Sequence, residues 1–463
     1  MKRTTIIETI KTIGQKVKVC GWVHAVRSHG KIIFIDLRDQ SGILQTVFIP
    51  ANKEAYEKVK EVRPEWVVEI EGTVGERPSG METEKLPTGK VELLAEEVTV
   101  LNQSKTPPFE LTGDSRKINE EKRLEYRYLD LRTERMKGNL ILRHQAALFI
   151  REFLDKKGFL EIETPILTKS TPEGARDYIV PSRREKGKFY ALPQSPQQYK
   201  QLLMVAGVEK YFQIAKCFRD EDTRGDRQPE FTQMDLEMSF VAQEDIMRLN
   251  EELLIALVHE LMPQKKIQQI PFPRITYQES VKKYATDRPD LRADKNDSDS
   301  LAFCWVIDFP FFERNDKGDW TFTHNPFSAP KPEHMDWLMA KKNIADILTT
   351  QYDIVLNGYE VGGGSIRTHT PEALEKAFEI MGYQSERIQK NFGHILEALS
   401  FGAPPHGGIA WGLERLLMLL VGEESIREVM AFPKTGDGRD LMMGAPSEVE
   451  SNQLKELHLK SAP

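Results

Sequence analysis

The sequence has few cysteines, no long apolar run and no excess of basic charge. Crossing a membrane takes about 20 consecutive apolar residues, and no apolar run in this 463-residue chain approaches that length. Residues 1–14 contain no continuous apolar stretch of the kind that a signal peptide carries. Cys20, Cys217 and Cys304 are too few and too scattered for a disulfide framework or a zinc cluster. These absences exclude a membrane-spanning helix and predict a cytoplasmic protein in a reducing compartment.

The charge balance is mildly acidic, because 64 basic residues face 71 acidic ones and the formal net charge is −7. This balance gives no overall attraction for nucleic acid, although a local basic patch can still bind it. Hydrophobic residues make up 40% of the chain, which is enough for large buried cores. At about 100–200 residues per domain, the length predicts roughly two to four domains.

Residues 1–104 have the composition of a small β domain. Runs rich in β-branched and aromatic residues follow one another, and a helix-like stretch at 51–62 separates the third run from the fourth. This order predicts a five-stranded barrel of the OB type, although another small β-barrel would give a similar pattern. The expected strands are 17–23, 31–37, 43–48, 67–74 and 90–101.

After the first domain the composition changes. Segment 105–135 begins near two adjacent prolines and then carries many charges, which predicts a hinge or linker. Residues 136–463 predict an α+β domain with an antiparallel sheet, because strands and helices do not alternate as they do in βαβ units. The expected helices are 139–157, 197–206 and 244–261, and the expected strands are 159–163, 211–219, 231–241, 305–309, 352–356 and 365–369.

The densest polar cluster lies between the expected strands 211–219 and 231–241. Its arginines suit a bidentate grip on phosphate, and an aromatic ring such as that of Phe231 can stack on a base. Its acids can hold a metal ion or an ammonium group. The alternative is a charged loop that only faces solvent. Against that alternative, charge that alternates with apolar strand residues points inward and needs a partner.

Three further candidates for ligand binding combine charged residues with a defined local structure. Residues 407–417 place glycines ahead of an apolar helix with one arginine, so a ligand can approach the backbone and an anion can bind at the helix start. A tight strand–helix corner with a surface arginine is the alternative.

Asp353 and Glu360 can share a Mg²⁺ ion, which binds phosphates through one or two carboxylates. Lys200 follows Gln197 by one helical turn, and a surface lysine is the alternative there.

Together these stretches resemble the class II aminoacyl-tRNA synthetases, whose three motifs correspond to residues 158–165, 219–237 and 408–417. The signature motifs of the class I synthetases are absent. Within the class, the sequence is similar to the bacterial aspartyl-tRNA synthetases over nearly the whole chain. The strings that carry this similarity are 171–178, 194–200, 218–233 and 360–367.

The resemblance implies an ATP-dependent reaction in two steps. The α-carboxylate of aspartate attacks the α-phosphate of ATP, and the 3′ end of tRNA then accepts the aspartyl group, so catalysis consists of positioning and charge stabilisation. Arg219 and Arg415 would be catalytic, and Asp353 and Glu360 would hold Mg²⁺. The resemblance assigns to ATP Arg219, Asp220, Glu221, Gln228, Phe231, Glu360, Gly412, Leu413, Glu414 and Arg415. It assigns to aspartate Glu173, Ser195, Gln197, Lys200, Arg219, Asp235, His324 and Arg367.

The same resemblance offers a reason for choosing aspartate. Lys200 and Arg367 would pair with the substrate's side-chain carboxylate, so neutral asparagine would leave two buried cations uncompensated. An asparaginyl- or lysyl-tRNA synthetase is the alternative within the class, and Lys200 argues against the asparaginyl enzyme. A non-catalytic synthetase-like protein that binds tRNA is a second alternative, and the intact motif residues argue against it. An amino-acid ligase without tRNA is a third, and the barrel argues against that one.

For the barrel, the resemblance implies binding of the tRNA anticodon. Phe34 would stack on a base, as aromatic residues of OB-folds do, whereas the residues alone favour Phe34 as a core residue. His29 and Gly80 are similar to the residues of nondiscriminating enzymes, which charge both tRNA-Asp and tRNA-Asn. The alternatives are an enzyme for tRNA-Asp only and a loop histidine of no consequence. The anticodon-binding candidates are Arg27, Phe34, Gln45, Arg77 and Glu92.

The chain also departs from the bacterial pattern. These enzymes usually carry a large inserted domain in the catalytic half, and here only a short polar stretch near residues 293–300 stands in its place. Glu414 stands where aspartate is common, and Asn325 stands where many relatives have a second histidine. Because no active-site string lies in the missing insert, we expect catalysis to survive. Motif 1 implies a homodimer.

Overall fold

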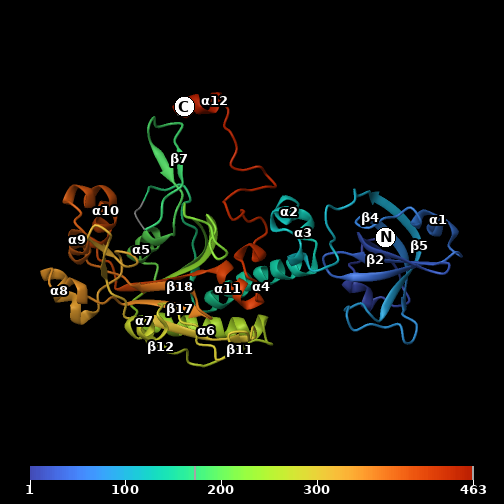
Figure 1. Ribbon diagram of the computed structural model, residues 1–463, viewed down its shortest axis with the longest axis horizontal. Helices are drawn as coiled ribbons and strands as arrows, with labels where there is room; N and C mark the ends of the chain where they lie inside the picture. The colour runs from blue at the N-terminus through green and yellow to red at the C-terminus, as the bar shows by residue number, and fades with distance from the viewer. Residues whose placement is uncertain (171–173, 461–463) are drawn as a thin grey trace. The chain divides into compact units, whose positions relative to one another are not determined.

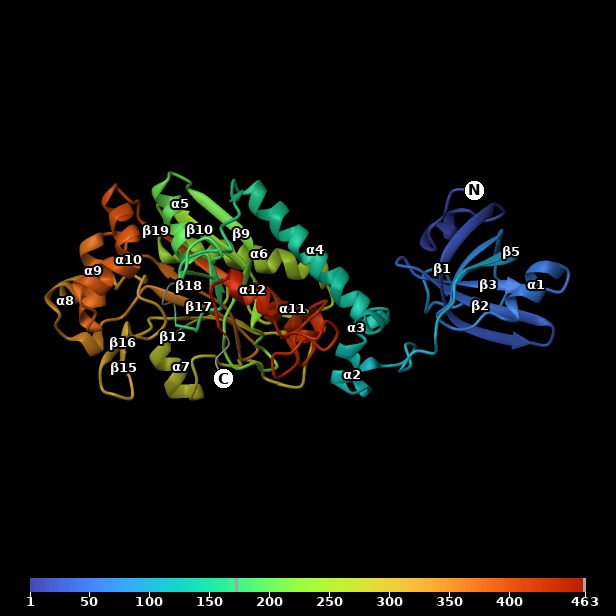
Figure 2. The same ribbon diagram turned by 90° about the horizontal axis from the view of Figure 1, so that it is seen from above.

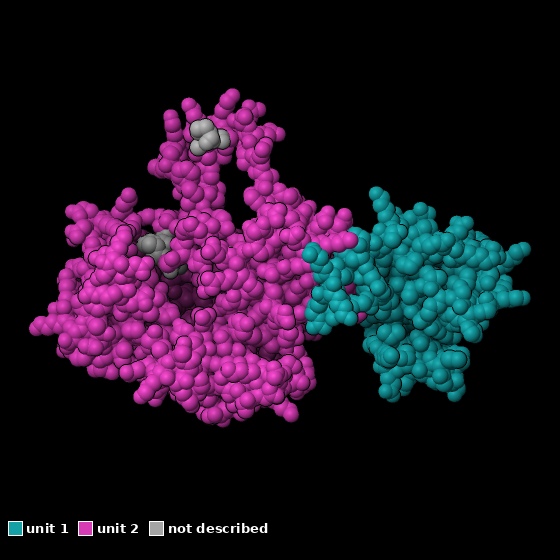
Figure 3. Space-filling view, in the orientation of Figure 1, with its two compact units in different colours: residues 1–119 teal, residues 120–463 magenta. Residues whose placement is uncertain are grey.

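The computed structural model describes residues 1–170 and 174–460. Glu173, one of the expected aspartate-binding residues, therefore lies outside the described residues. The elements are labelled in Figure 1, and Figure 2 shows them from above. The chain divides into two compact units, Met1–Asn119 and Glu120–Pro463, which Figure 3 colours separately. This division falls inside the segment 105–135 that the sequence marks as a hinge.

The first unit is a closed barrel in which the strands follow the order β1-β2-β3-β5-β4. The predicted OB-type barrel is confirmed, and the helix α1 (Lys53–Val59) separates the third strand from the fourth as expected. The short 3₁₀ helix η1 (Ile7–Lys11) precedes the barrel, and η2 (Ser115–Lys117) follows it. The strands are β1 (Lys16–His29), β2 (Ile32–Arg38), β3 (Ile43–Phe48), β4 (Val67–Glu76) and β5 (Val91–Asn102).

Alternation along β2 decides which side chains face the barrel core. Ile33, Ile35 and Leu37 are buried, and because successive side chains of a strand point to opposite faces, Phe34 and Asp36 lie on the outer face. Phe34 is only partly buried. The interpretation of Phe34 as a core residue is therefore wrong, since the register of β2 places it outside.

The second unit is built on an eight-stranded sheet in the order β12-β14-β17-β18-β19-β10-β9-β6. Every pair from β14 across to β9 is antiparallel, and only the edge pairs β12–β14 and β6–β9 are parallel. The predicted α+β domain with an antiparallel sheet is confirmed. The strands are β6 (Leu160–Glu161), β9 (Lys210–Phe218), β10 (Glu230–Ser239), β12 (Arg274–Thr276), β14 (Phe303–Ile307), β17 (Gln351–Leu356), β18 (Tyr359–Ile366) and β19 (His406–Gly412).

One strand lies elsewhere than the sequence predicted. The expected strand 365–369 is instead β18, Tyr359–Ile366. Its run Gly362–Gly364 has few side chains to indicate a strand, yet these glycines pair with Trp411, Ala410 and Ile409 of β19. Within the described residues, three two-stranded sheets lie outside the main sheet: β7 (Ile179–Pro181) with β8 (Phe189–Ala191), β11 (Lys266–Ile267) with β13 (Ser300–Leu301), and β15 (Phe312–Arg314) with β16 (Trp320–Phe322).

Three helices cover one face of the main sheet and form its hydrophobic core. They are α4 (Glu134–Lys156), α6 (Gln243–Leu261) and α11 (Leu413–Val421) (Figure 2). Their buried leucines and isoleucines pack against alternate strand residues such as Met234 and Leu236. The opposite face of β10 is thereby left for polar side chains. Thr133 caps α4, and Gly158, with φ +82°, lies just beyond its end.

The remaining helices surround the sheet. α5 (Gln197–Val205) was predicted, but the helices between β16 and β19 were not, although the buried residues of Ser385–Ser400 recur at the spacing of an amphipathic helix. The helices of this group are α8 (Met335–Ala340), α9 (Pro371–Ile380) and α10 (Ser385–Ser400), with η3 (Pro332–His334) and η4 (Ile344–Asp346). The others are α2 (Glu120–Glu125), α3 (Arg127–Asp130), α7 (Tyr277–Tyr284), α12 (Ser451–Glu456) and η5 (Ile426–Val429).

The helices α2 and α3 belong to the second unit and are held there by buried charge. Arg123 pairs with Glu428 at 2.9 Å and with Asp130 at 3.2 Å. Burial would raise the pKa of Glu428, but Arg123 and Arg135 hold it at about 2. This carboxylate therefore stays charged and fixes α2 to η5. In the described ranges, 1–170 and 174–460, no helix has the length and apolar character needed to cross a membrane.

Candidate active site

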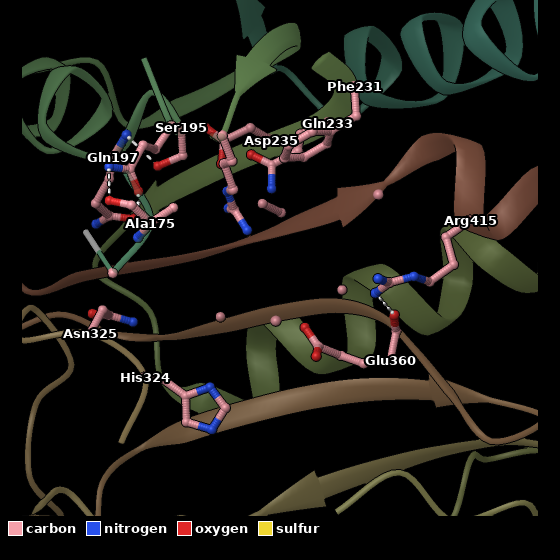
Figure 4. Close-up of a pocket in the computed structure, with 18 of the residues that line it drawn as sticks. Ala175, Ser195, Gln197, Phe231, Gln233, Asp235, His324, Asn325, Glu360 and Arg415 are labelled. Atoms are coloured by element: carbon pink, nitrogen blue, oxygen red, sulfur yellow. Dashed lines mark hydrogen bonds between the residues drawn. The ribbon is translucent and has the colours of Figure 1, made fainter. Parts of the chain in front are cut away.

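The candidate site begins with a row of side chains on one face of β10. Phe231, Gln233, Asp235 and Glu237 are spaced two residues apart along the strand and so point to the same side of it. Asp235 and Glu237 are fully buried, and a buried charge is stable only when it is paired. Figure 4 shows Phe231, Gln233 and Asp235 at one side of a pocket.

Two cations provide the pairing. Lys200 Nζ of α5 lies 2.6 Å from Asp235 Oδ1 and 3.2 Å from Glu237 Oε2. Arg367, just after β18, donates to Glu237 through Nε at 2.9 Å and Nη2 at 3.1 Å. All four residues are at most 2% exposed. The two cations are thus already balanced by two carboxylates, which corrects the sequence argument that they would be uncompensated without aspartate: Glu237 was missing from it.

The pKa values of the two carboxylates shift in opposite directions. Burial raises the pKa of Asp235, and its ion pair with Lys200 offsets this only in part. Burial also acts on Glu237, but Arg367 and Lys200 outweigh it and bring the pKa of Glu237 to about 2. Asp235 Oδ2 is buried and, among the described residues, accepts no hydrogen bond.

The floor of the pocket consists of residues with little or no side chain. Gly412, Ala410 and Gly408 of β19 lie opposite Gln233, Asp235 and Glu237. A Cβ on Gly408 would lie 2.0 Å from Glu237 Oε2, which shows that any larger residue there would displace the carboxylate. The pocket above this floor has a volume of about 390 Å³ and is visible as a hollow in Figure 3.

Asp353 and Glu360 form the wall opposite β10. A Cβ on Gly363 would lie 2.7 Å from Asp353 Oδ1 and 3.6 Å from Glu360 Oε1, so both carboxylates border one small space that only a glycine keeps open. Burial, and then the charge of Glu360, raise the pKa of Asp353. Two adjacent carboxylates of this kind fit Mg²⁺, which takes one or two carboxylates together with phosphate oxygens. Among described residues, no cluster of three or more His, Cys, Asp or Glu side chains suits a metal ion.

Arg219 and Arg415 lie at the open end of the pocket, which we call its mouth. The guanidinium of Arg219 lies 5.1 Å from the centre of the Phe231 ring. Arg415 donates to the carbonyl oxygen of Glu360 at 2.5 Å and to Asp226 Oδ2 at 3.2 Å. The Nε atoms of both arginines are buried and, within the described part of the chain, donate no hydrogen bond. Both residues line the pocket, and a guanidinium group carries five N–H donors that suit an anionic ligand.

His324 and Asn325 close another side of the pocket (Figure 4). The ring of His324 packs edge-on against Phe309 with 4.9 Å between the ring centres. Burial lowers the pKa of His324, and the nearby Glu360 opposes this shift. Asn325 Oδ1 accepts a hydrogen bond from the backbone N–H of Phe327 at 3.0 Å, so its side chain also shapes the loop.

The structure brings most of the predicted catalytic, aspartate, ATP and metal residues to this one pocket. Leu413 is an exception, because its side chain lies in the hydrophobic core, and Asp220 lines a neighbouring open hollow. Glu414 accepts hydrogen bonds from Thr232 N and Arg143, which makes its carboxylate a structural anchor. The predicted residues that line the pocket are Ser195, Gln197, Lys200, Arg219, Glu221, Gln228, Phe231, Asp235, His324, Asp353, Glu360, Arg367, Gly412, Glu414 and Arg415.

Sequence reasoning missed Gln233, Glu237 and Asp226. The signal for the first two was present, since they flank Asp235 at the two-residue spacing of a strand. Asp226 gave no signal, because its partner Arg415 is distant in the sequence.

The anticodon candidates gather on the outer face of the barrel. Arg27 lies opposite Phe34 across β1 and β2 and pairs with Asp36 at 2.7 Å. Gln45 donates to Glu92 at 2.8 Å. These polar groups surround an aromatic ring, which is the arrangement that single-stranded nucleic acids bind.

The remaining barrel candidates lie nearer its loops. Arg77 donates to the carbonyl oxygen of Val91 at 3.2 Å. His29 is exposed at the end of β1, and Gly80 is exposed with φ +83°. The structure thus places both of these residues where a large partner can reach them.

Solved structures share this combination of barrel and pocketed antiparallel sheet. Asparaginyl-tRNA synthetase from Pyrococcus horikoshii, complexed with asparaginyl-adenylate, matches with a TM-score of 0.76 at 24% identity, over 94% of this chain and 98% of that one. A putative aspartyl-tRNA synthetase from Leishmania major matches with a TM-score of 0.73 at 20% identity, over 93% and 94%. The fold is therefore that of the class II synthetases.

The sequence comparisons define the family. Residues 119–436 match the class II tRNA synthetases (D, K and N), and residues 17–101 match the OB-fold nucleic acid binding domain. The chain belongs to the class II tRNA synthetases of the D, K and N group.

Individual relatives match along their whole length. The aspartate–tRNA(Asp/Asn) ligase of Dehalococcoides mccartyi strain CBDB1 is 40% identical over 98% of both chains. The aspartate–tRNA ligase of Staphylococcus carnosus is 39% identical over 99% of both. Both alignments extend over 587 positions, and this chain has 463 residues. At least 124 of those positions (587 less 463) thus have no counterpart here.

Proposed function

We propose that this protein is an aspartate–tRNA ligase that activates aspartate with ATP and transfers it to tRNA. The observation that carries the proposal is the pair of buried cations, Lys200 and Arg367, at the closed end of a pocket whose floor has almost no side chains. Relatives that match over the whole chain are named for this activity. Lys200 and Arg367 carry only donors, which a substrate carboxylate can accept, whereas the ammonium group of a lysine substrate carries no acceptor for them.

In the first step the α-carboxylate of aspartate attacks the α-phosphate of ATP, and pyrophosphate leaves. No side chain needs to be a nucleophile, so the contribution of the protein is orientation and charge stabilisation. Arg219 holds the α-phosphate and the attacking carboxylate, and Arg415 holds the terminal phosphate. Phe231 offers its ring to the adenine. Asp235 Oδ2 accepts from the ammonium group of the substrate.

Asp353 and Glu360 would hold Mg²⁺ together with the phosphates of ATP. The ion neutralises phosphate charge when it is bound. Asp353 is buried beside a second carboxylate, so a cation there relieves the repulsion that raises its pKa. In the second step, the 3′-terminal adenosine of tRNA attacks the aspartyl-adenylate and AMP leaves.

For tRNA recognition we propose that the outer face of the barrel binds the anticodon. Phe34 would stack on a base, flanked by Arg27, Gln45 and Glu92. We further propose that both tRNA-Asp and tRNA-Asn are charged, on the basis of His29 and Gly80 and of the printed names of relatives. The product on tRNA-Asn would then need a separate amidotransferase.

The direct test is aminoacylation with radiolabelled aspartate on pure tRNA-Asp and pure tRNA-Asn transcripts. Charging of both supports the full proposal, and charging of tRNA-Asp alone removes only the nondiscriminating part. If neither tRNA is charged, aspartate-dependent pyrophosphate exchange separates a lost tRNA interaction from a wrong substrate assignment.

We also propose a homodimer. An exposed apolar surface follows α4 and the segment after it, and patches of this kind mark interfaces. The exposed residues of this surface are Ile141, Leu148, Leu160, Ile166 and Leu167. Sedimentation equilibrium tests the assembly, and a monomer at micromolar concentration would refute it.

The three free cysteines fit a reducing compartment, so we place the enzyme in the cytoplasm.

A further inference from the structure

Among the uncharged side chains that line the pocket, Gln233 has an amide whose orientation decides which of its groups a ligand meets. Gln233 lies on β10 between Phe231 at the mouth and Asp235 deeper in the pocket (Figure 4). An amide presents an acceptor at one end and two donors at the other, and only its hydrogen bonds fix which end faces where. None of the residue roles proposed for the activation step fixes the orientation of the Gln233 amide.

Cys217 supplies such a group. Its Sγ lies 3.2 Å from Gln233 Oε1. The two residues are diagonal neighbours across β9 and β10, because Cys217 pairs with Phe231 and Ala215 pairs with Gln233. Cys217 is fully buried. Its thiol is a donor, and when it donates to Oε1 the NH₂ group of Gln233 is directed the other way, toward the pocket.

The direction of the amide matters because the proposed substrates are rich in oxygen. The reacting carboxylate and the α-phosphate present only acceptors, and the NH₂ group of Gln233 can donate to them. A flipped amide would instead direct its carbonyl oxygen at these anionic groups. The pocket already contains the carboxylates of Asp235 and Glu237, so a further acceptor would repel the same substrate atoms.

We propose that Cys217 is a positioning residue for the activation step: its thiol holds the amide of Gln233 so that the NH₂ group donates to a carboxylate or phosphate oxygen of the reacting substrates. This inference rests on the proposed function, because it takes aspartate and ATP as the ligands. Cys217 itself contacts no substrate and acts only through Gln233.

The test compares Cys217→Ser with Cys217→Val in aspartate-dependent pyrophosphate exchange. Serine keeps a donor, whereas valine keeps the volume and removes it. We expect Cys217→Val to lower kcat about three- to tenfold, the range for loss of one weak hydrogen bond, with little change in the KM for ATP. Cys217→Ser should retain most of the wild-type kcat.

A purely structural cysteine predicts the opposite order, since buried valine is tolerated and an added hydroxyl is costly. Thermal unfolding of both variants accompanies the kinetics. Cys304→Val is the matched control: Cys304 is also fully buried, but it packs with Val306, Phe309 and Val355 and does not itself line the pocket. The control should leave kcat unchanged.

A double-mutant cycle keeps the inference falsifiable if Cys217→Val is unstable. In a Gln233→Ala background, Cys217→Val should cause no further loss of kcat relative to Cys217→Ser. Equal kcat values for the serine and valine variants in the Gln233 background would overturn the inference. An inactive wild-type protein would instead refute the proposed function, so the two failures are distinguishable.

Discussion

The two ends of the pocket are built on different principles. At the closed end, Lys200, Asp235, Glu237 and Arg367 are fully buried and balance one another before any ligand binds. At the mouth, Arg219 and Arg415 are half-buried, and each keeps an Nε that lacks a hydrogen-bond partner among the described residues. The closed end is thus preorganised and part of the fold, whereas the mouth is completed by the ligand. Removing a basic residue should therefore reduce both stability and activity at the closed end, but mainly activity at the mouth.

The strongest way to break the closed end is Lys200→Ala. Removing one partner of a buried ion pair leaves carboxylates uncompensated, so the free energy of unfolding should fall by about 3–5 kcal/mol. Aspartate-dependent pyrophosphate exchange should fall at least about 1,000-fold, with ATP binding largely kept. Equilibrium unfolding and exchange kinetics measure both effects. Lys186→Ala, at an exposed lysine, is the control, and unchanged aspartate activation in Lys200→Ala would contradict the assigned role.

At the mouth, Arg219→Gln should separate activity from stability. We expect exchange to fall about 100- to 1,000-fold, the range for loss of a donor to developing charge. The free energy of unfolding should change by less than about 1 kcal/mol, since no buried partner is left behind. Arg183→Gln, at another exposed position, gives the baseline. A loss of stability equal to that of Lys200→Ala would remove the distinction between the two ends.

The barrel provides a third site for comparison, because its proposed role is to bind tRNA and not aspartate or ATP. Phe34→Ala should raise the KM for tRNA about tenfold, because stacking on a base contributes about 1–3 kcal/mol. Pyrophosphate exchange without tRNA should not change, since the pocket lies in the other unit. Phe401→Ala, at a ring that is 77% exposed, serves as the control. An unchanged KM for tRNA in Phe34→Ala would contradict the anticodon assignment.

The smallest expected effect concerns the metal wall. Gly363→Ala places a methyl group 2.7 Å from Asp353 Oδ1, so the carboxylate must shift. We expect roughly fivefold lower exchange at limiting Mg²⁺, a loss of about 1 kcal/mol, and partial recovery at high Mg²⁺. A titration of exchange rate against Mg²⁺ measures this shift, and a curve that overlays the wild type would contradict the shared metal site.

Local sequence pattern indicated a small β-barrel and an antiparallel sheet, whereas the resemblance to the class II synthetases supplied most of the residues that the structure brings to the pocket. Strand alternation and the glycine-rich strings are local signals, and Asp235 and Arg415, which lie in them, both line the pocket. Glu237 was missed because its partners, Lys200 and Arg367, come from α5 and from the end of β18. Phe34 could not be assigned to a face until the register of β2 was known. The Cys217–Gln233 contact likewise exists only once β9 and β10 pair.

Our central claim is that Lys200 and Arg367, at the closed end of the pocket, select a carboxylate side chain. Pyrophosphate exchange by the wild-type protein, with aspartate and asparagine compared at equal concentration, tests this claim most directly. We expect rapid exchange with aspartate and, because an amide would place its NH₂ group against Lys200 or Arg367, at least about 1,000-fold slower exchange with asparagine. Comparable exchange with both amino acids would contradict the role given to these two cations.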